Sequence, residues 1–144
     1  MARNKIDIIG KLLTTVSLSV RITDINYGNH TGNNALVGLI QEVRMVWLKQ
    51  YNYTELHIEG IGLIMSDLAI EFLNESFYGD RLEIQLYVGE ITKKSFELLY
   101  LITTMRNDKS ITIAKAKTGM VCFDYKEKQV AFIPSTLKEI IGGS

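Results

Sequence analysis

The sequence is poor in cysteine, in proline and in excess charge of either sign. Its single cysteine, Cys122, has no partner within the chain, which excludes an internal disulfide and a metal site built from several thiolates. Lysine and arginine together number 16, as do aspartate and glutamate, so no net positive field attracts nucleic acid or an anionic lipid surface. We therefore expect a protein of a reducing compartment that binds neither nucleic acid nor membranes and holds no metal.

Long apolar runs are missing as well. No stretch approaches the roughly 18 to 20 apolar residues of a membrane helix. Asp7 and Lys11 interrupt the apolar residues near the start, where a signal peptide requires an unbroken apolar core. We expect a cytoplasmic protein, in which a glycosylation pattern such as Asn74-Glu75-Ser76 has no significance.

The composition is otherwise that of a globular protein. Hydrophobic residues make up 47% and charged residues 22% of the chain, which excludes disorder for most of it. A chain of 144 residues fits one core and buries roughly 68–70% of the surface that the unfolded chain exposes. We expect residues 1–144 to form a single domain.

Apolar and polar residues alternate in several stretches, which predicts strands. The alternation over Val16–Ile22 is typical of a strand with one buried face. Four further stretches after Gly62 favour strands, and the short polar connections between them predict antiparallel hairpins. These stretches are Leu63–Leu73, Arg81–Thr92, Ser95–Arg106 and Ser110–Tyr125.

One long segment, Asn34–Lys49, has the composition of a helix. Its apolar residues lie around nearly the whole circumference, which predicts a helix buried on all sides, with Asn33 or Asn34 as its N-cap. A short helix is expected at Ser135–Ile141. The fold class is α+β, with one long buried helix wrapped by an antiparallel sheet of about five strands. Since one such unit leaves a sheet edge uncovered, we expect association through that edge.

A polar loop joins the first strand to the long helix. It reads Asp24-Ile25-Asn26-Tyr27-Gly28-Asn29-His30-Thr31-Gly32-Asn33, and Glu42-Val43-Arg44 follows within the helix. This arrangement resembles the hot-dog-fold acyl-CoA thioesterases of the 4-hydroxybenzoyl-CoA type, whose pattern is D-T-D-x-x-G-H-V-N-N with a helix ending in E-A-R. The resemblance covers nearly the whole chain, continuing through Ile70–Leu73, Tyr78–Ile84, Ser95, Val121–Asp124 and Ile133-Pro134.

The resemblance implies a hot-dog fold and a function. The implied reaction is hydrolysis of a thioester of CoA or of acyl-carrier protein at a subunit interface, in a homodimer or homotetramer, with no cofactor. Asp24 matches the first aspartate of the family pattern, His30 its histidine and Asn33 its second asparagine. Asn26 stands where family members usually carry the working carboxylate.

Thioester hydrolysis needs a group that activates water and donors for the oxyanion. The first N–H groups of the helix, around Gly32, Asn33 and Asn34, are suited to bind the thioester oxygen. Asn26 can orient a water molecule but cannot take its proton. His30, Glu42 and Asp24 are therefore the candidate bases.

Each of these residues also has a structural interpretation. Asp24 and Asn26 can cap the loop by accepting backbone N–H bonds. His30 can anchor the loop, and a buried Glu42 can pair with a loop amide. Asn33 can serve as an N-cap alone.

Three functions remain open on these residues. The first is the acyl-CoA or acyl-carrier-protein thioesterase. The second is a non-catalytic protein that binds acyl thioesters, which the asparagine at position 26 motivates. The third is an enoyl-CoA hydratase of the same fold, since Asp24-x-Asn26 followed by His30 is similar to the D-x-N-P-x-H element of those enzymes.

Overall fold

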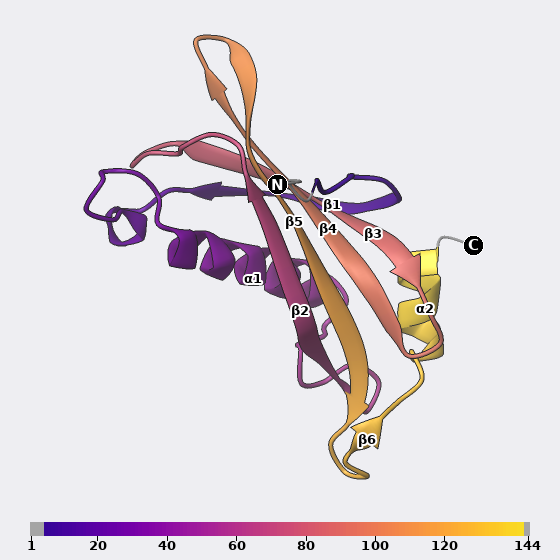
Figure 1. Cartoon of the computed structure of the whole chain (residues 1–144). Coiled ribbons are helices and arrows are strands. Elements are labelled where there is room, and N and C mark those ends of the chain that lie inside the picture. Colours follow the sequence, from indigo (N-terminus) through magenta and orange to yellow (C-terminus); the bar gives the residue numbers. More distant parts are fainter. Residues whose placement is uncertain (1–4, 143–144) are drawn as a thin grey trace.

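The long helix α1, Asn33–Lys49, lies against one face of an antiparallel sheet (Figure 1). The computed structural model describes residues 5–142, so residues 1–4 and 143–144 of the predicted domain lie outside the described residues. A 3-10 turn, Ile22–Asp24, precedes α1, and α2, Ser135–Gly142, ends the described chain. The strands are β1 (Lys11–Ser19), β2 (Gly62–Phe72), β3 (Arg81–Ile91), β4 (Ser95–Arg106), β5 (Lys109–Asp124) and the short β6 (Gln129–Val130).

The strands follow the order β1-β3-β4-β5-β2, and β6 pairs with β5. All of these pairs are antiparallel. The order places β2, which follows α1 directly in the sequence, at one edge of the sheet and β1 at the other. The predicted α+β arrangement, one long helix on an antiparallel sheet with a short C-terminal helix, is confirmed.

Apolar side chains of α1 and of the inner sheet face form one core. Trp47 of α1 is fully buried and meets the ring of Phe96 on β4 edge to face, with 6.5 Å between the ring centroids. Cys122 on β5 is buried in the same core. The inward positions of the central strands complete it, among them Leu82, Ile84, Leu86, Leu98, Ile102 and Met120.

The first strand is displaced from its predicted position. It spans Lys11–Ser19 rather than Val16–Ile22. Its register with β3 shifts between Leu12 and Thr14, and this irregularity interrupts the alternation that would have marked the earlier residues as a strand. The 3-10 turn at Ile22–Asp24 takes the last predicted strand residue out of the sheet.

The prediction for the helix N-cap is wrong. The N-cap is Gly32, not Asn33 or Asn34, and no side chain caps the first turn. The N–H of Gly32 donates to the carbonyl of Asp24 at 2.9 Å, which holds the chain extended up to this residue. Asn33 is therefore the first residue of the helix.

The prediction that α1 is buried on all sides is also wrong. Its buried residues lie on the side that faces the sheet. The opposite side exposes Asn34, Gln41, Glu42 and Lys49 to solvent. The apolar residues between these positions, Met45 and Val46, are half-buried, so one side of the helix is only partly covered within a single chain.

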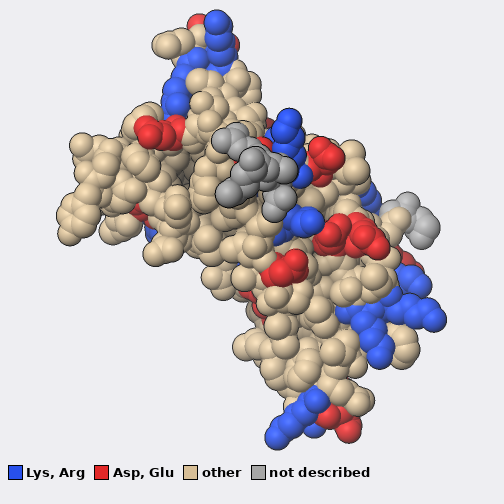
Figure 2. Space-filling view, in the orientation of Figure 1, with Lys and Arg blue, Asp and Glu red and all other residues tan. Residues whose placement is uncertain are grey.

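Charged side chains are dispersed over the surface. On the face that Figure 2 shows, basic groups are accompanied by acidic ones and do not merge into a continuous basic surface. No helix within residues 5–142 is long and apolar enough to cross a membrane.

Candidate active site

The polar loop before α1 closes on itself around Asn26. The N–H of Asn26 donates to the carbonyl of His30 at 3.0 Å, and the carbonyl of Asn26 accepts the N–H of Asn29 at 3.1 Å. The side-chain Oδ1 accepts the N–H of Gly28 at 2.8 Å. Asn29 has a φ of 63°, a conformation that asparagine tolerates better than most residues. Asn26 thus shapes the loop through both its backbone and its exposed side chain.

Asp24 is buried at the base of the loop and faces Arg21. Its carboxylate accepts the backbone N–H of Arg21 at 2.8 Å and the guanidinium at 3.3 and 3.4 Å. The hydrogen bond to Asp24, together with its charge, raises the pKa of the Arg21 guanidinium. Since the Asp24 carbonyl also receives the N–H of Gly32, this residue ties the end of the 3-10 turn to the start of the helix.

The ring of His30 is half-buried and packs over Gly28. A Cβ at position 28 would lie 3.1 Å from both Cδ2 and Nε2 of the ring, so glycine leaves the space that the ring occupies. Nδ1 of His30 lies 3.2 Å from the carbonyl oxygen of Thr31. Nε2 lies 3.9 Å from Oε1 of Glu75, a residue that follows β2.

The start of α1 presents unpaired donors. The first intrahelical bond runs from the N–H of Leu36 to the carbonyl of Gly32 at 3.1 Å, so the N–H groups of residues 33–35 have no acceptor within the helix. These groups and the aligned peptide dipoles make this end of the helix positive. The N–H of Gly32 itself is occupied by the carbonyl of Asp24.

A cavity of about 210 Å³ lies at the start of α1. His30, Thr31 and Asn33 line it from the loop and the first helical turn. Its other walls are apolar side chains and the segment after β2, namely Leu36, Phe72, Leu73, Asn74, Glu75, Ser76 and Ile113. The cavity therefore combines an imidazole, the positive end of a helix and apolar walls, which suits a ligand with a carbonyl next to an apolar group.

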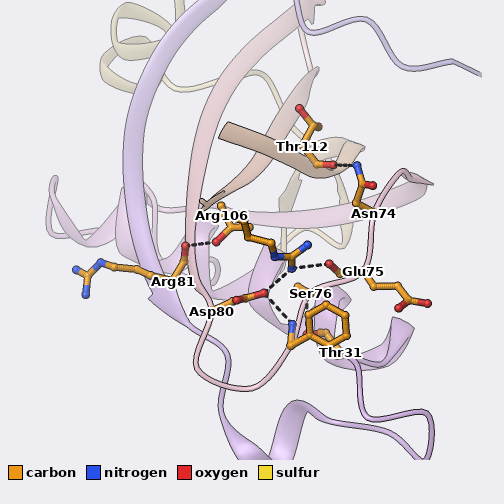
Figure 3. Close-up of polar contacts among 10 residues, drawn as sticks. Thr31, Asn74, Glu75, Ser76, Asp80, Arg81, Arg106 and Thr112 are labelled. Atoms are coloured by element: carbon orange, nitrogen blue, oxygen red, sulfur yellow. Dashed lines mark hydrogen bonds and ion pairs between the residues drawn. The ribbon is translucent and has the colours of Figure 1, made fainter. Parts of the chain in front are cut away.

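Arg106 on β4 holds the segment after β2 against the sheet. Its Nη2 donates to the carbonyl oxygen of Glu75 at 2.7 Å and to the carboxylate of Asp80 at 2.6 Å (Figure 3). The guanidinium also lies over the ring of Phe77, 5.0 Å from its centroid. The backbone at Glu75 is thereby fixed, while its carboxylate remains exposed beside the cavity.

A second set of bonds joins this segment to the polar loop. Ser76 is buried and bonds to Thr31 twice: its carbonyl accepts the Thr31 N–H at 2.7 Å, and its hydroxyl donates to Thr31 Oγ1 at 2.6 Å. Asn74 is fixed from the other side, since its Nδ2 donates to the carbonyl of Thr112 at 2.8 Å (Figure 3). We call the pair of bonds between Thr31 and Ser76 the loop clasp.

The structure brings some of the predicted site residues together and separates others. His30 and Asn33 line the cavity, whereas Asn26 and Asn34 are exposed and do not line it. Glu42 is exposed further along α1, on a separate surface groove that also includes Lys49. Of the three candidate bases, His30 is the one at the cavity.

Sequence patterns alone do not identify Glu75 or Ser76 as site residues. The order of the elements could have indicated their position, because β2 is the next element after α1 and runs in the opposite direction along the helix. The end of β2 must therefore lie near the start of α1, which is where His30 and Asn33 are found.

Comparison with known proteins gives a family match over most of the chain. Residues 20–141 match the family described as the Thioesterase-like superfamily. The 1,4-dihydroxy-2-naphthoyl-CoA hydrolase of Microcystis aeruginosa is 30% identical over 82 residues, which span 57% of this chain and 56% of that protein. The protein of the same name from Acaryochloris marina is 35% identical over 68 residues, 47% of this chain and 49% of that protein. The chain thus spans about half the length of these curated relatives.

Solved structures match a larger share of the chain than these two relatives do. A 1,4-dihydroxy-2-naphthoyl-CoA thioesterase from Synechocystis superposes with a TM-score of 0.79 at 21% identity, covering 89% of this chain and 94% of that one. A 4-hydroxybenzoyl-CoA thioesterase variant in complex with 4-hydroxybenzoyl-CoA also gives a TM-score of 0.79, at 15% identity, with 89% and 97% covered. At these identities the likeness establishes the fold, which is the predicted hot-dog fold.

Proposed function

Because the chain belongs to the Thioesterase-like superfamily, we propose that it hydrolyses acyl-CoA thioesters in the cavity at the start of α1. One observation carries this proposal: the cavity combines His30, the first turn of α1 and apolar walls in a single site. Each feature meets one requirement of thioester hydrolysis. His30 activates water, the first turn of α1 supplies a donor for the carbonyl oxygen, and the apolar walls contact the acyl group.

The carbonyl oxygen of the thioester binds at the first turn of α1. The unpaired N–H of Asn33, the residue at the start of the helix that lines the cavity, donates to the oxygen and stabilises the negative charge that develops when water adds to the carbonyl carbon. The helix dipole strengthens this stabilisation because the charge develops at the positive end. No metal is required for this step.

His30 takes the proton of the attacking water. Its imidazole is the candidate base that lines the cavity, and a neutral imidazole has a nitrogen that accepts a proton. Asn26 supports this role indirectly, since its side chain shapes the turn at Gly28 over which the ring packs. Asp24 serves as a structural anchor through its bonds with Arg21.

The acyl group lies against Leu36, Phe72, Leu73 and Ile113. Aromatic acyl groups are the first class to test, because the relatives and structural neighbours named above act on naphthoyl- and benzoyl-CoA esters. The carrier of the acyl group is CoA in this proposal, and acyl-carrier protein is the alternative. Both occur in the cytoplasm, where we expect the protein to act.

The chain acts as a homodimer, or as a homotetramer built from such dimers. The outer edge of β2 is unpaired among the described strands. The last residue of this strand, Phe72, lines the cavity. Met65 and Phe72 face the same side of the sheet as their buried cross-strand neighbours Met120 and Ala114, yet both are substantially exposed. A second copy paired along β2 would cover them, together with the uncovered side of α1.

The test is release of free thiol from a panel of acyl-CoA and acyl-carrier-protein thioesters that varies in chain length and aromaticity. We expect turnover of at least one aryl-CoA, and roughly a hundredfold loss of kcat in His30→Ala. His57→Ala is the matched control, because His57 is exposed in the loop after α1. Binding of CoA esters without release of thiol would overturn the proposal and support the non-catalytic binding protein.

A further inference from the structure

The imidazole of His30 lies near a carboxylate at the wall of the cavity. Its Nε2 lies 3.9 Å from Oε1 of Glu75, and both residues line the cavity. We propose that Glu75 supplies the carboxylate that the loop lacks at Asn26, and that Glu75 and His30 together hold and activate the hydrolytic water. This inference rests on the proposed thioesterase function and assigns a second catalytic residue to it.

The hydrogen bond of His30 to Thr31 fixes which ring nitrogen is free. The carbonyl of Thr31 can only accept, so Nδ1, at 3.2 Å from it, carries the hydrogen. In the neutral ring Nε2 is then left with its lone pair, and this is the nitrogen nearest to Glu75. A proton acceptor and a carboxylate thus meet at the same point of the cavity wall.

The separation of the two groups fits a bridging water. At 3.9 Å, Nε2 of His30 and Oε1 of Glu75 are too far apart for a direct hydrogen bond. A water molecule between them can donate one hydrogen to each. Its lone pairs then point away from both acceptors, which is the orientation a nucleophile needs toward a carbonyl carbon in the cavity.

The positions of both residues are held by their immediate neighbours. Thr31, next to His30, and Ser76, next to Glu75, are joined by the loop clasp. Arg106 binds the carbonyl oxygen of Glu75 itself, as Figure 3 shows. The backbone of Glu75 is therefore fixed on both sides although its side chain is exposed, and this placement keeps the carboxylate within reach of the imidazole.

The reaction step is balanced with these two groups. The water oxygen forms a bond to the carbonyl carbon of the thioester while one water proton passes to Nε2 of His30. Glu75 stays ionised: it accepts a hydrogen bond from the remaining O–H of the water, which becomes the O–H of the acid product, and its negative charge stabilises the resulting imidazolium. The bond from carbon to sulfur then breaks, and His30 returns its proton to the departing thiolate, which yields the free acid and CoA.

The experiment compares kcat and KM of the purified full chain and its variants, with the aryl-CoA that the wild type turns over fastest. We expect Glu75→Gln and His30→Gln each to lower kcat roughly a hundredfold, with KM unchanged within about twofold. Since both residues act on one water, the double variant should lie within about tenfold of either single variant. Glu75→Asp, which keeps the charge on a shorter side chain, should give an intermediate kcat.

Glu127→Gln is the matched control, since Glu127 is exposed in the turn between β5 and β6. Thermal unfolding followed by circular dichroism verifies that each variant folds. Full kcat in a folded Glu75→Gln variant, or losses that multiply in the double variant, would overturn the assignment of Glu75 and leave the thioesterase proposal intact. A wild-type chain that releases no thiol from any ester would overturn the thioesterase proposal itself, and with it this assignment.

Discussion

The hydroxyl of Ser76 donates a 2.6 Å hydrogen bond to Thr31 Oγ1, between two residues that are 45 positions apart. Ser76 is 2% exposed and Thr31 9% exposed, so water does not compete for this bond. The contact joins the polar loop before α1 to the segment after β2. It therefore fixes the two walls of the cavity relative to each other, and with them His30 and Glu75.

Replacing Ser76 with alanine tests the loop clasp. The change removes the hydroxyl bond and leaves Thr31 Oγ1 buried without its donor, so we expect the free energy of unfolding to fall by about 1–3 kcal/mol. We also expect a lower kcat, because the wall that carries Glu75 is loosened. Urea unfolding and thiol release measure the two effects, with Ser110→Ala, at an exposed position at the start of β5, as the control. Unchanged stability of Ser76→Ala would show that the clasp does not hold the walls.

Adding a methyl group at Gly28 tests the placement of the His30 ring. The new Cβ would lie 3.1 Å from Cδ2 and Nε2 and 3.3 Å from Oδ1 of Asn26, so the ring must shift. The neighbours must move by a few tenths of an ångström. Since a displacement of about 1 Å at a catalytic group can lower activity about a hundredfold, we expect kcat of Gly28→Ala to fall by roughly threefold to tenfold. Gly142→Ala is the control, since a Cβ there meets no atom within 4 Å. Full activity of Gly28→Ala would contradict a catalytic position for the ring.

A buried polar cluster under α1 is the subject of the third prediction. Arg44 lies 3.4 Å from the carboxylate of Glu55 and donates to the hydroxyl of Tyr100 at 3.3 Å. That hydroxyl also lies 2.8 Å from Thr118 Oγ1, and burial raises the pKa of Tyr100, so it stays protonated well above neutral pH. The cluster anchors the middle of α1 to the loop after it and to the sheet.

Arg44→Met removes the cation from this cluster. Because Glu55 is then left mostly buried and unpaired, we expect the free energy of unfolding to fall by about 3 kcal/mol. The double variant Arg44→Met with Glu55→Gln removes the unpaired charge and should recover part of this loss. Urea unfolding measures both variants. A double variant less stable than Arg44→Met alone would contradict the pairing.

The fold could be predicted from the sequence where patterns are regular. Alternation located β3, β4 and β5 closely, and the apolar composition after the loop located α1. The prediction failed at β1, where the irregularity after Leu12 shifts the phase of the alternation. The prediction that α1 is buried on all sides was wrong, because apolar residues around a helix do not show which of its sides the rest of the chain covers.

The candidate site could be predicted only where its residues are close in sequence. His30 and Asn33 belong to one loop and the helix after it, and both line the cavity. Glu42, from the same helix, faces another groove because its position on the helix turns it away. Glu75 was not predicted, since its contact with His30 depends on the return of β2 along α1 and on no local pattern.

Cys122 should be unreactive in the folded protein. Burial raises the pKa of its thiol to about 11, so the thiol stays protonated and shielded at neutral pH. A disulfide reagent that detects free thiol should therefore label the native chain slowly and the urea-unfolded chain at once. Because of the raised pKa, the Cys122 thiol stays protonated in the native state at a pH at which the same thiol ionises in the unfolded chain. The free energy of unfolding should therefore fall as pH rises toward about 11. Cys122→Ala should lack this contribution, and rapid labelling of the native chain would contradict the buried thiol.

The final prediction is that two copies of the chain associate through the edge of β2. A lysine on an edge strand opposes pairing with a second strand, because its charge would be buried between the two copies. Met65 is suited to this test, since it faces the inner side of β2 and is 39% exposed in the single chain. We expect light scattering after size-exclusion chromatography to give a dimer or tetramer for the wild type and a monomer for Met65→Lys. Met105→Lys, at an exposed position near the tip of the hairpin between β4 and β5, should keep the wild-type mass. If Met65→Lys also kept that mass, the copies would have to associate through another surface, and the exposed inner face of β2 would need a different explanation.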